Sequence, residues 1–275
     1  MFIPMAVAIA EARVGKRGER YYSGRVPQLL ERGFIAFKSS TWMIVLSGFV
    51  EPVLYLLSFG YGIGKLLPTI TVGNESIKYA VFIAPALLAT SAMNGAIYDS
   101  TMNVFFKLNH DRIYHGMLAT SMGPLDVALG EIGWALLRGF SYACAFMAVV
   151  APLGLIPSLW GLLAIPAAVL IAFGFASCGM AVTSYMKSFQ QLEIITVFLL
   201  PMFLFSGSFY PLTVFPQWLQ FTVNLLPLTH AINLVRGLCL GHINMGLVGH
   251  ALYFVIMIIC GLFFTTKRLN ALFMK

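Results

Sequence analysis

The sequence predicts an all-α integral membrane protein with six transmembrane helices and both termini in the cytoplasm. The chain has 275 residues, of which 59% are hydrophobic and only 10% are charged, whereas soluble domains carry about 25% charged residues. Several apolar stretches approach the roughly 20 residues that cross the hydrocarbon core of a bilayer. Basic residues gather on one side of these stretches, as they do on the cytoplasmic side of membrane proteins.

Residues 1–41 are expected to form a basic cytosolic segment that contains one interfacial helix. Within this segment Leu30, Phe34 and Phe37 recur near helical spacing, with Arg32 between them. A helix of this kind lies in the plane of the membrane interface, with its apolar face toward the acyl chains.

The six expected spans lie in one membrane domain, residues 42–266, and a cytosolic tail, residues 267–275, follows it. The segment Leu212–Val248 remains fairly apolar and has a single charge, but prolines interrupt it. This composition favours broken helices that pack against protein or line a cavity. The expected spans are residues 42–64, 80–101, 127–150, 159–185, 193–211 and 249–266.

The distribution of basic residues predicts the orientation of these spans. Thirteen Lys and Arg residues lie in segments on the side of the termini, against three on the other side. Such an excess marks the cytoplasmic side and is attracted to anionic lipid headgroups. We therefore expect membrane lipid, and no nucleic acid, among the partners of the chain.

Three charged residues, Glu51, Glu131 and Arg138, lie within the apolar stretches and should face protein or water. Glu131 and Arg138 are seven residues apart, so they lie two turns apart on one helix face and can share a polar seam. One interpretation is a proton relay or ion path, which would make the protein a proton- or ion-coupled secondary transporter using Glu51 and Glu131. The other is that Glu131 and Arg138 snorkel or pair near the cytoplasmic end.

Other chemistry finds little support in the sequence. Gly60–Lys65 is rich in glycine, but a Walker A loop would need Ser or Thr where Leu66 stands. An intramembrane serine hydrolase using Ser206 and His250 would need glycine where Leu204 stands. We expect no catalytic residue, metal site or cofactor on this chain.

Several motifs together resemble the ABC-2-type permeases. Within that family the resemblance is to the branch of the nodulation protein J type lipo-oligosaccharide exporters and the daunorubicin-resistance permeases, and it covers roughly residues 30–270. The motifs are Glu51–Leu56 (EPVLYL), Gly130–Ala135 (GEIGWA), Pro201–Gly207 (PMFLFSG), Pro227–His230 (PLTH) and Val235–Gly237 (VRG).

The resemblance implies a permease subunit of an ATP-driven exporter in the bacterial inner membrane, which moves an amphiphile such as a lipid-linked saccharide, glycolipid or drug. Such permeases pair as dimers, so a second copy of the chain is an expected partner. They also bind a separate ATPase subunit, which holds ATP and magnesium. Residues 26–40 would be the elbow helix, and residues 212–245 would be re-entrant helices between spans five and six.

The resemblance also implies two sets of functional residues. Residues 105–118 would contain the helix that docks into the ATPase. Aromatic and methionine side chains of the first and fifth spans would line the substrate path, although ordinary packing or lipid contact is the alternative for each of them. The expected coupling residues are Phe105, Lys107, Asp111, Arg112 and Tyr114, and the expected path residues are Tyr55, Phe59, Met202, Phe205 and Phe209.

Overall fold

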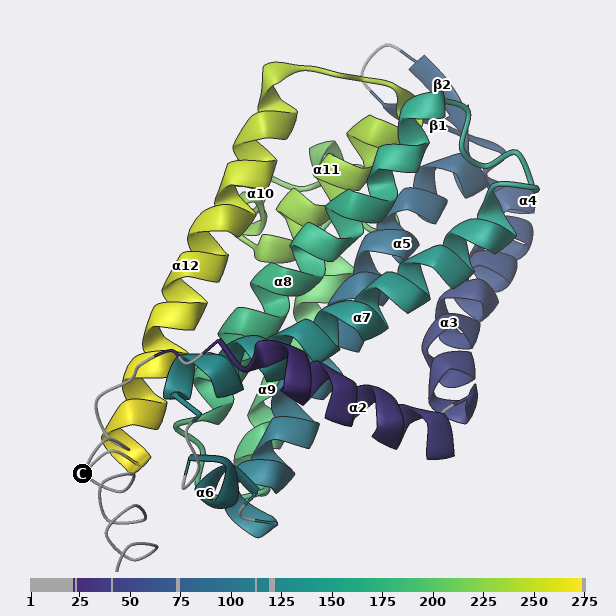
Figure 1. The fold of residues 1–275 in the computed structure, drawn as a ribbon. Helices are drawn as coiled ribbons and strands as arrows, with labels where there is room; N and C mark the ends of the chain where they lie inside the picture. The colour runs from purple at the N-terminus through teal and green to yellow at the C-terminus, as the bar shows by residue number, and fades with distance from the viewer. Residues whose placement is uncertain are drawn as a thin grey trace, which may run out of the picture.

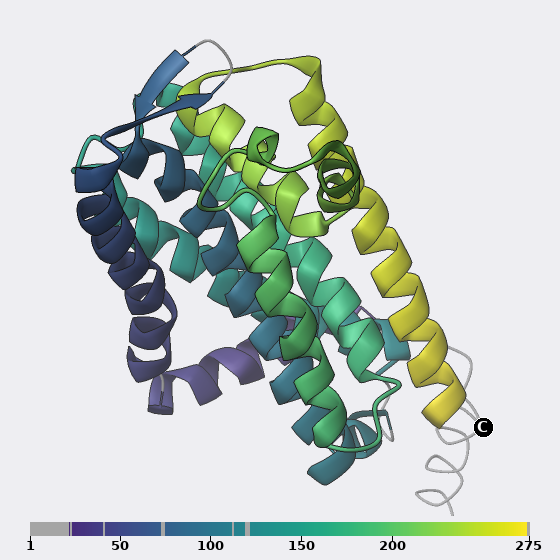
Figure 2. The same cartoon turned by 180° about the vertical axis from the view of Figure 1, so that it is seen from behind.

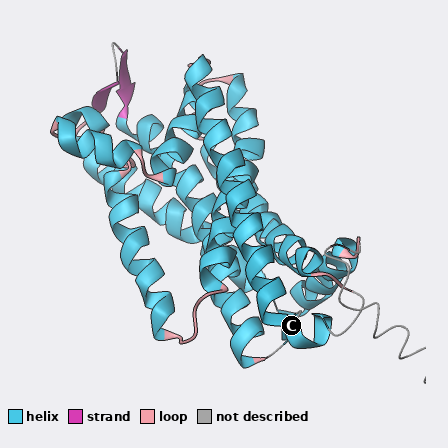
Figure 3. Ribbon diagram, turned by 90° about the vertical axis from the view of Figure 1, so that its left-hand side faces the viewer, coloured by secondary structure: helices cyan, strands magenta, loops and turns pink. Residues whose placement is uncertain are grey.

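The computed structural model describes residues 22, 24–40, 42–72, 75–111, 113–118 and 122–273, without side chains at 36–40, 42–49, 115 and 273. All four basic residues before residue 22, Arg13, Lys16, Arg17 and Arg20, therefore lie outside the described part. Within it the fold is nearly all helical, with one small hairpin (Figure 3). The longer helices are α2 (Val26–Ser40), α3 (Trp42–Leu57), α5 (Tyr79–Tyr98), α7 (Pro124–Val150), α8 (Ala164–Thr183), α9 (Gln190–Phe205), α10 (Gln217–Asn224), α11 (Pro227–Leu240) and α12 (Met245–Phe273).

Shorter helical segments extend or connect these helices. They are the π-helical turns Ser58–Ile63 after α3 and Asp99–Asn103 and Phe106–His110 after α5, the short helices α4 (Gly64–Leu66) and α6 (Ile113–Leu118), and the 3-10 turns Leu159–Leu163 and Leu212–Val214. One end of the bundle carries the hairpin and is called the hairpin end below. The opposite end, where α12 ends and α9 begins, is called the basic end (Figure 1).

Four helices in the described residues are long and apolar enough to cross a membrane. They are Tyr79–His110, Pro124–Val150, Leu159–Thr183 and Met245–Leu272. The pair α10 and α11, bent by 85°, would make a fifth span if it crosses as one unit, and α9 is a shorter apolar helix. The protein is therefore an all-α, multi-pass membrane protein.

The helix ends differ from the expected span ends because hydropathy predicts which residues lie in the hydrocarbon core, and a helix can begin or end outside that core. The helix expected to end at residue 101 continues to His110, since a polar sequence can remain helical outside the hydrocarbon region. The fifth apolar helix ends earlier than expected, at Phe205. Gly207 follows it with a φ of 75°, a conformation that glycine adopts without steric penalty.

The segment between the first two expected spans, residues 65–79, contains an antiparallel hairpin. Strand β1 (Thr69–Val72) pairs with β2 (Glu75–Lys78), and Ile70 lies opposite Ile77. β-branched residues favour the extended conformation, and all four residues of β1 are β-branched. The hairpin is hard to predict from sequence because each strand has only four residues.

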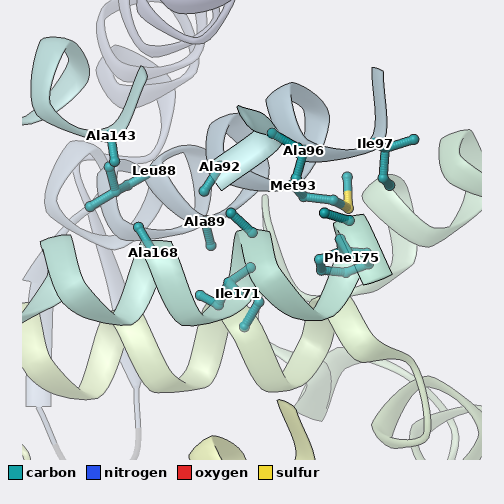
Figure 4. Packing of buried hydrophobic residues seen from close by; sticks show 14 of the residues in the cluster. Leu88, Ala89, Ala92, Met93, Ala96, Ile97, Ala143, Ala168, Ile171 and Phe175 are labelled. Atoms are coloured by element: carbon teal, nitrogen blue, oxygen red, sulfur yellow. The ribbon is translucent and has the colours of Figure 1, made fainter. Parts of the chain in front are cut away.

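Helix α5 is the central helix and packs against α3, α7, α8 and α11. Its buried face is rich in alanine, including Ala89, Ala92 and Ala96, each with a relative exposure of 0%. Small side chains let helix backbones approach closely in a membrane, where apolar surface alone gives little driving force for association. Figure 4 shows this layer, in which Met93 of α5 lies close to Phe175 of α8.

Helix α2 runs across the basic end of the bundle and packs on α7 (Figure 1). The contact is close because a Cβ atom on Gly130 of α7 would lie 2.6 Å from Cδ1 of Leu29. The carboxylate of Asp126 accepts hydrogen bonds from the backbone N–H groups of Arg25, at 3.0 Å, and Gly123, at 2.9 Å. The start of α2 is thereby tied to the start of α7.

The close contact of α8 with α12 gives a stability prediction. A Cβ atom on Gly261 would lie 2.6 Å from the backbone carbonyl carbon of Ser177, whereas one on Gly249, in the same helix, would meet nothing within 4 Å. We expect Gly261→Ala to destabilise the protein by about 1–3 kcal/mol through overpacking. Gly249→Ala should be neutral or stabilising by up to about 1 kcal/mol. Thermal unfolding of the purified variants measures both, and equal melting temperatures would contradict the expected clash.

Candidate functional site

A cavity of about 240 Å³ lies between α3, α5 and α9. Among the described residues, Glu51 is the only charged one in its lining, and Asn94, Thr90, Thr196 and the Tyr55 hydroxyl supply the uncharged polar groups. The Thr90 hydroxyl donates to the Ala86 carbonyl of its own helix, so Asn94, Thr196 and Tyr55 offer the other neutral polar groups. The other lining residues are Pro52, Tyr55, Leu87, Met93, Leu199, Leu200 and Phe203.

Aromatic rings extend the cavity wall along α3 toward the hairpin end. The ring centroid of Tyr55 lies 6.0 Å from that of Phe59 and 5.9 Å from that of Phe203. The Phe209 centroid lies 4.7 Å from Phe59 and 5.0 Å from Phe203. The Tyr79 hydroxyl donates to the Phe209 carbonyl at 3.1 Å. These contacts join α3, the start of α5 and the turn after α9 into one aromatic wall.

The structure brings together three of the five expected path residues. Tyr55 lines the cavity, and Phe59 and Phe209 belong to the aromatic wall beside it. Met202 packs against the core, and Phe205 contacts Phe215, with 5.8 Å between ring centroids. Neither of these two lines the cavity.

Phe203, which was not among the expected path residues, does line the cavity. Phe203 follows Thr196 by seven residues and Leu199 by four, and residues at this spacing share a helix face. All three line the cavity between α3, α5 and α9. The helical spacing of Thr196, Leu199 and Phe203 therefore places Phe203 on the cavity face of α9, which the motif alone did not indicate.

Two ion pairs join the long helix that begins with α5 to α7 near the basic end. The Lys107 ammonium lies 2.6 Å from Oε2 of Glu131, and Nε of Arg138 lies 2.7 Å from Oδ2 of Asp99. The Asp99 and Arg138 side chains are 2% and 9% exposed. Glu131 and Arg138 thus each have a partner on the neighbouring helix, an arrangement that favours a structural tie between two helices.

Asp99 was not among the expected charged residues, although it lies at the end of the apolar stretch 80–101. The rule that selected Glu51 and Glu131, a charge within an apolar run, would have selected it too. Asp99 begins a π-helical turn, a distortion that often accompanies functional positions. Nδ2 of Asn103 lies 3.5 Å from Oδ1 of Asp99.

The expected coupling residues divide into buried and exposed ones. Phe105 and Tyr114 are 6% and 0% exposed, and Lys107 is held by Glu131. Burial, together with the nearby Glu131 carboxylate, raises the pKa of the Tyr114 phenol well above its ordinary value, so the phenol stays neutral. Asp111 is exposed, and Arg112 lies outside the described residues. Phe105 and Tyr114 therefore support the segment from within, whereas Asp111 faces outward.

An aromatic contact joins this segment to the link between α8 and α9. The Phe189 ring centroid lies 6.5 Å from that of Phe105 and 6.0 Å from that of Phe106. The His110 ring lies 6.2 Å from Phe106. Phe106 and Phe189 are 40% and 47% exposed. The basic end therefore presents aromatic surface beside the exposed Asp111.

A multi-pass helical bundle with a largely apolar cavity among its helices can hold an apolar ligand within the membrane, as a membrane transport protein must. Comparison with known proteins defines the family: the sequence model described as "ABC-2 type transporter" matches residues 25–240, and the chain belongs to the ABC-2 type transporter family. The matched region contains the cavity, the aromatic wall and both ion pairs.

Individual relatives agree with this assignment. The chain is 30% identical to nodulation protein J of Rhizobium leguminosarum bv. trifolii over 240 residues, which are 87% of this chain and 90% of that protein. It is 32% identical to nodulation protein J of Sinorhizobium fredii over 206 residues, 74% of this chain and 77% of that one. It is 26% identical to the inner membrane transport permease YadH of Escherichia coli over 188 residues, 67% and 70% of the two chains.

The family assignment confirms the resemblance that the motifs predicted. Proteins of the ABC-2 permease family are membrane components of transporters. The chain is therefore a multi-pass transport component and not itself an enzyme.

Proposed function

We propose that the chain is the transmembrane permease subunit of an ATP-driven ABC exporter in the bacterial inner membrane. Its substrate would be an amphiphile: a lipid-linked saccharide, a glycolipid or a drug. The observation that supports this most directly is the cavity between α3, α5 and α9, whose lining is mostly apolar and aromatic with few polar groups. Ligand sites of this composition bind apolar bodies and orient them through a small number of polar contacts.

In the proposed topology six helices, α3, α5, α7, α8, α9 and α12, cross the membrane and leave both termini in the cytoplasm. The transverse position of α2 supports its role as an elbow helix at the membrane interface, and Phe34 and Ile35 on it are 63% and 65% exposed. The 85° bend between α10 and α11 supports a re-entrant pair between the last two spans (Figure 2).

Energy would come from a separate ATPase subunit at the basic end, because the sequence contains no Walker A loop. That subunit would bind ATP and magnesium and would contact the segment Phe105–Leu118. A second permease copy would complete the transporter. The apolar surface of α9 supports such a contact, since Val197 and Phe198 are 69% and 73% exposed.

A pull-down of the tagged protein from its own host in mild detergent, followed by mass spectrometry, tests this proposal. We expect a stoichiometric partner that carries a GxxxxGK[ST] loop. Recovery of the intact permease without such a partner, even after crosslinking, would overturn the ABC mechanism. A second tag on another copy of the chain tests the homodimer in the same experiment.

The alternative, a proton-coupled transporter, has one observation in its favour: of the residues that the structure describes, Glu51 alone brings a charge to the cavity lining. Glu131 is not in that lining and is paired with Lys107. We expect transport to continue when the proton gradient is collapsed, and Glu51→Gln to lower it by less than about tenfold, because one hydrogen bond contributes about 1 kcal/mol. Complete loss of transport in both conditions would favour the proton-coupled mechanism instead.

A further inference from the structure

A second cavity, of about 240 Å³, lies at the hairpin end between α11 and the start of α12. This outer cavity is far more polar than the one beside Glu51. Five of its eight lining residues carry polar side chains and none is acidic. The lining residues are Asn233, Arg236, Gly237, Leu240, His242, Asn244, Leu247 and His250.

Arg236 lines this cavity, and its guanidinium is anchored by groups that lie outside the lining. Its Nη2 donates to the Gly207 carbonyl at 2.9 Å and lies 3.4 Å from the Phe82 carbonyl. The centre of the guanidinium lies 3.9 Å from the centroid of the Phe82 ring. Among the described residues, no Asp or Glu forms an ion pair with Arg236. The carbonyls and the ring orient the guanidinium, but they leave its charge without a counterion.

The other polar groups present hydrogen-bond donors. Oδ1 of Asn244 lies 3.3 Å from the Leu247 backbone N–H and accepts from it, so the Asn244 amide NH₂ remains available. Nδ1 of His250 lies 2.7 Å from Nδ1 of His230. In the tautomer in which His230 donates, His250 carries its hydrogen on Nε2 and can donate to a ligand.

An acidic group, Glu75, contacts one of the lining residues. Oε2 of Glu75, on β2, lies 3.3 Å from Nε2 of His242, and both side chains are about half exposed, at 65% and 46%. Glu75 therefore holds His242 in place without lining the outer cavity.

We propose that the outer cavity binds an anionic oxygen group, in particular a phosphate ester. A guanidinium combined with amide and imidazole donors suits phosphate oxygens. Charge-assisted hydrogen bonds are stronger than hydrogen bonds between neutral groups, and the planar guanidinium can donate two parallel hydrogen bonds to two phosphate oxygens. Such a group would supply the counterion that Arg236 lacks. It can come from the headgroup of a bilayer lipid or from the transported amphiphile, and both carry the same chemistry.

The sharpest variant is Asn233→Asp, which places a carboxylate three residues before Arg236 on the same face of α11. The substitution is isosteric and supplies an internal counterion, so we expect the protein to fold normally. Arg236→Gln removes the charge but also the contact with the Gly207 carbonyl, so it serves as the second variant. Lys78→Gln is the matched control, because Lys78 is an exposed cation at the same end of the molecule.

Each variant is reconstituted in nanodiscs that contain equal amounts of phosphatidylglycerol and phosphatidylcholine, and native mass spectrometry counts the lipids retained after release. Delipidated protein is titrated separately with inorganic phosphate in a calorimeter. We expect the original protein and Lys78→Gln to bind the anion, and Asn233→Asp to bind it at least about tenfold more weakly.

The two measurements distinguish the source of the anion. Retention of phosphatidylglycerol that is lost in Asn233→Asp supports a lipid headgroup. Binding of inorganic phosphate alone, also lost in Asn233→Asp, supports a phosphate group on the transported molecule. Equal anion binding in Asn233→Asp, Lys78→Gln and the original protein, or no anion binding in any of them, would overturn the proposed site. None of these outcomes depends on the ATPase, so the site can fail while the exporter function stands.

Discussion

Replacing Asp99 with leucine is expected to destabilise the folded protein strongly. The substitution leaves the Arg138 side chain, 9% exposed, without the carboxylate that lies 2.7 Å from it. Removing one partner of a buried ion pair costs about 3–5 kcal/mol, because an uncompensated charge stays buried. Domains are stable by only about 5–15 kcal/mol, so this loss is a large part of the total. The yield of monodisperse protein and its melting temperature measure the effect.

The double variant Asp99→Leu with Arg138→Leu is expected to recover much of the lost stability. Replacing both members of a buried pair with apolar residues is often neutral or stabilising. Glu75→Leu is the control for the loss of a carboxylate, since the Glu75 side chain is 65% exposed and surface changes usually stay within about 0.5 kcal/mol. A double variant no more stable than Asp99→Leu alone would show that the two side chains do not act as a pair.

Substitution of Asp111 and Arg112 together by alanine is expected to lower export at least about tenfold, the effect of a loss of about 1.4 kcal/mol in coupling free energy. Asp111 is exposed at the end of the long helix that begins with α5. The Asp111 substitution should leave the yield and melting temperature of the permease unchanged, because the outward-facing Asp111 side chain forms no ion pair within the described part of the chain.

The measurement is ATP hydrolysis and substrate export by the reconstituted transporter, made side by side. We expect hydrolysis to continue while export falls, since the ATPase would no longer transmit its motion to the permease. Glu193→Ala is the control, because Glu193 is an exposed carboxylate at the same end of the bundle. Normal export per ATP in the double variant would contradict a coupling role for this segment.

The charged residues illustrate how far the sequence could predict the site. An apolar run that contains a charge is visible in the sequence, and this rule selected Glu51, Glu131 and Arg138. The partners were not visible, because Glu131 pairs with Lys107 and Arg138 with Asp99 across two helices. Such pairs depend on the rotation and the axial offset of one helix against another, which no local pattern encodes.

The residues of the cavity between α3, α5 and α9 could also be predicted only in part from the sequence. Three expected path residues, Tyr55, Phe59 and Phe209, lie in or beside its wall, because the motifs that carry the resemblance include these parts of α3 and of the turn after α9. Met202 and Phe203 are adjacent in the same motif, yet Phe203 alone lines the cavity. Neighbouring helical residues point about 100° apart, so only the packing of α9 against α3 and α5 decides which of them faces inward.

The sequence by itself determined that the chain is a multi-pass helical membrane protein of the ABC-2 type transporter family. Composition and hydropathy act locally along the chain, so they can be read without coordinates. Only the tertiary structure decided the ion-pair partners, the members of the two cavities and the approach of α12 to α8 at Gly261. These features join segments far apart in the sequence, and the close packing of helices sets their geometry within a few ångströms.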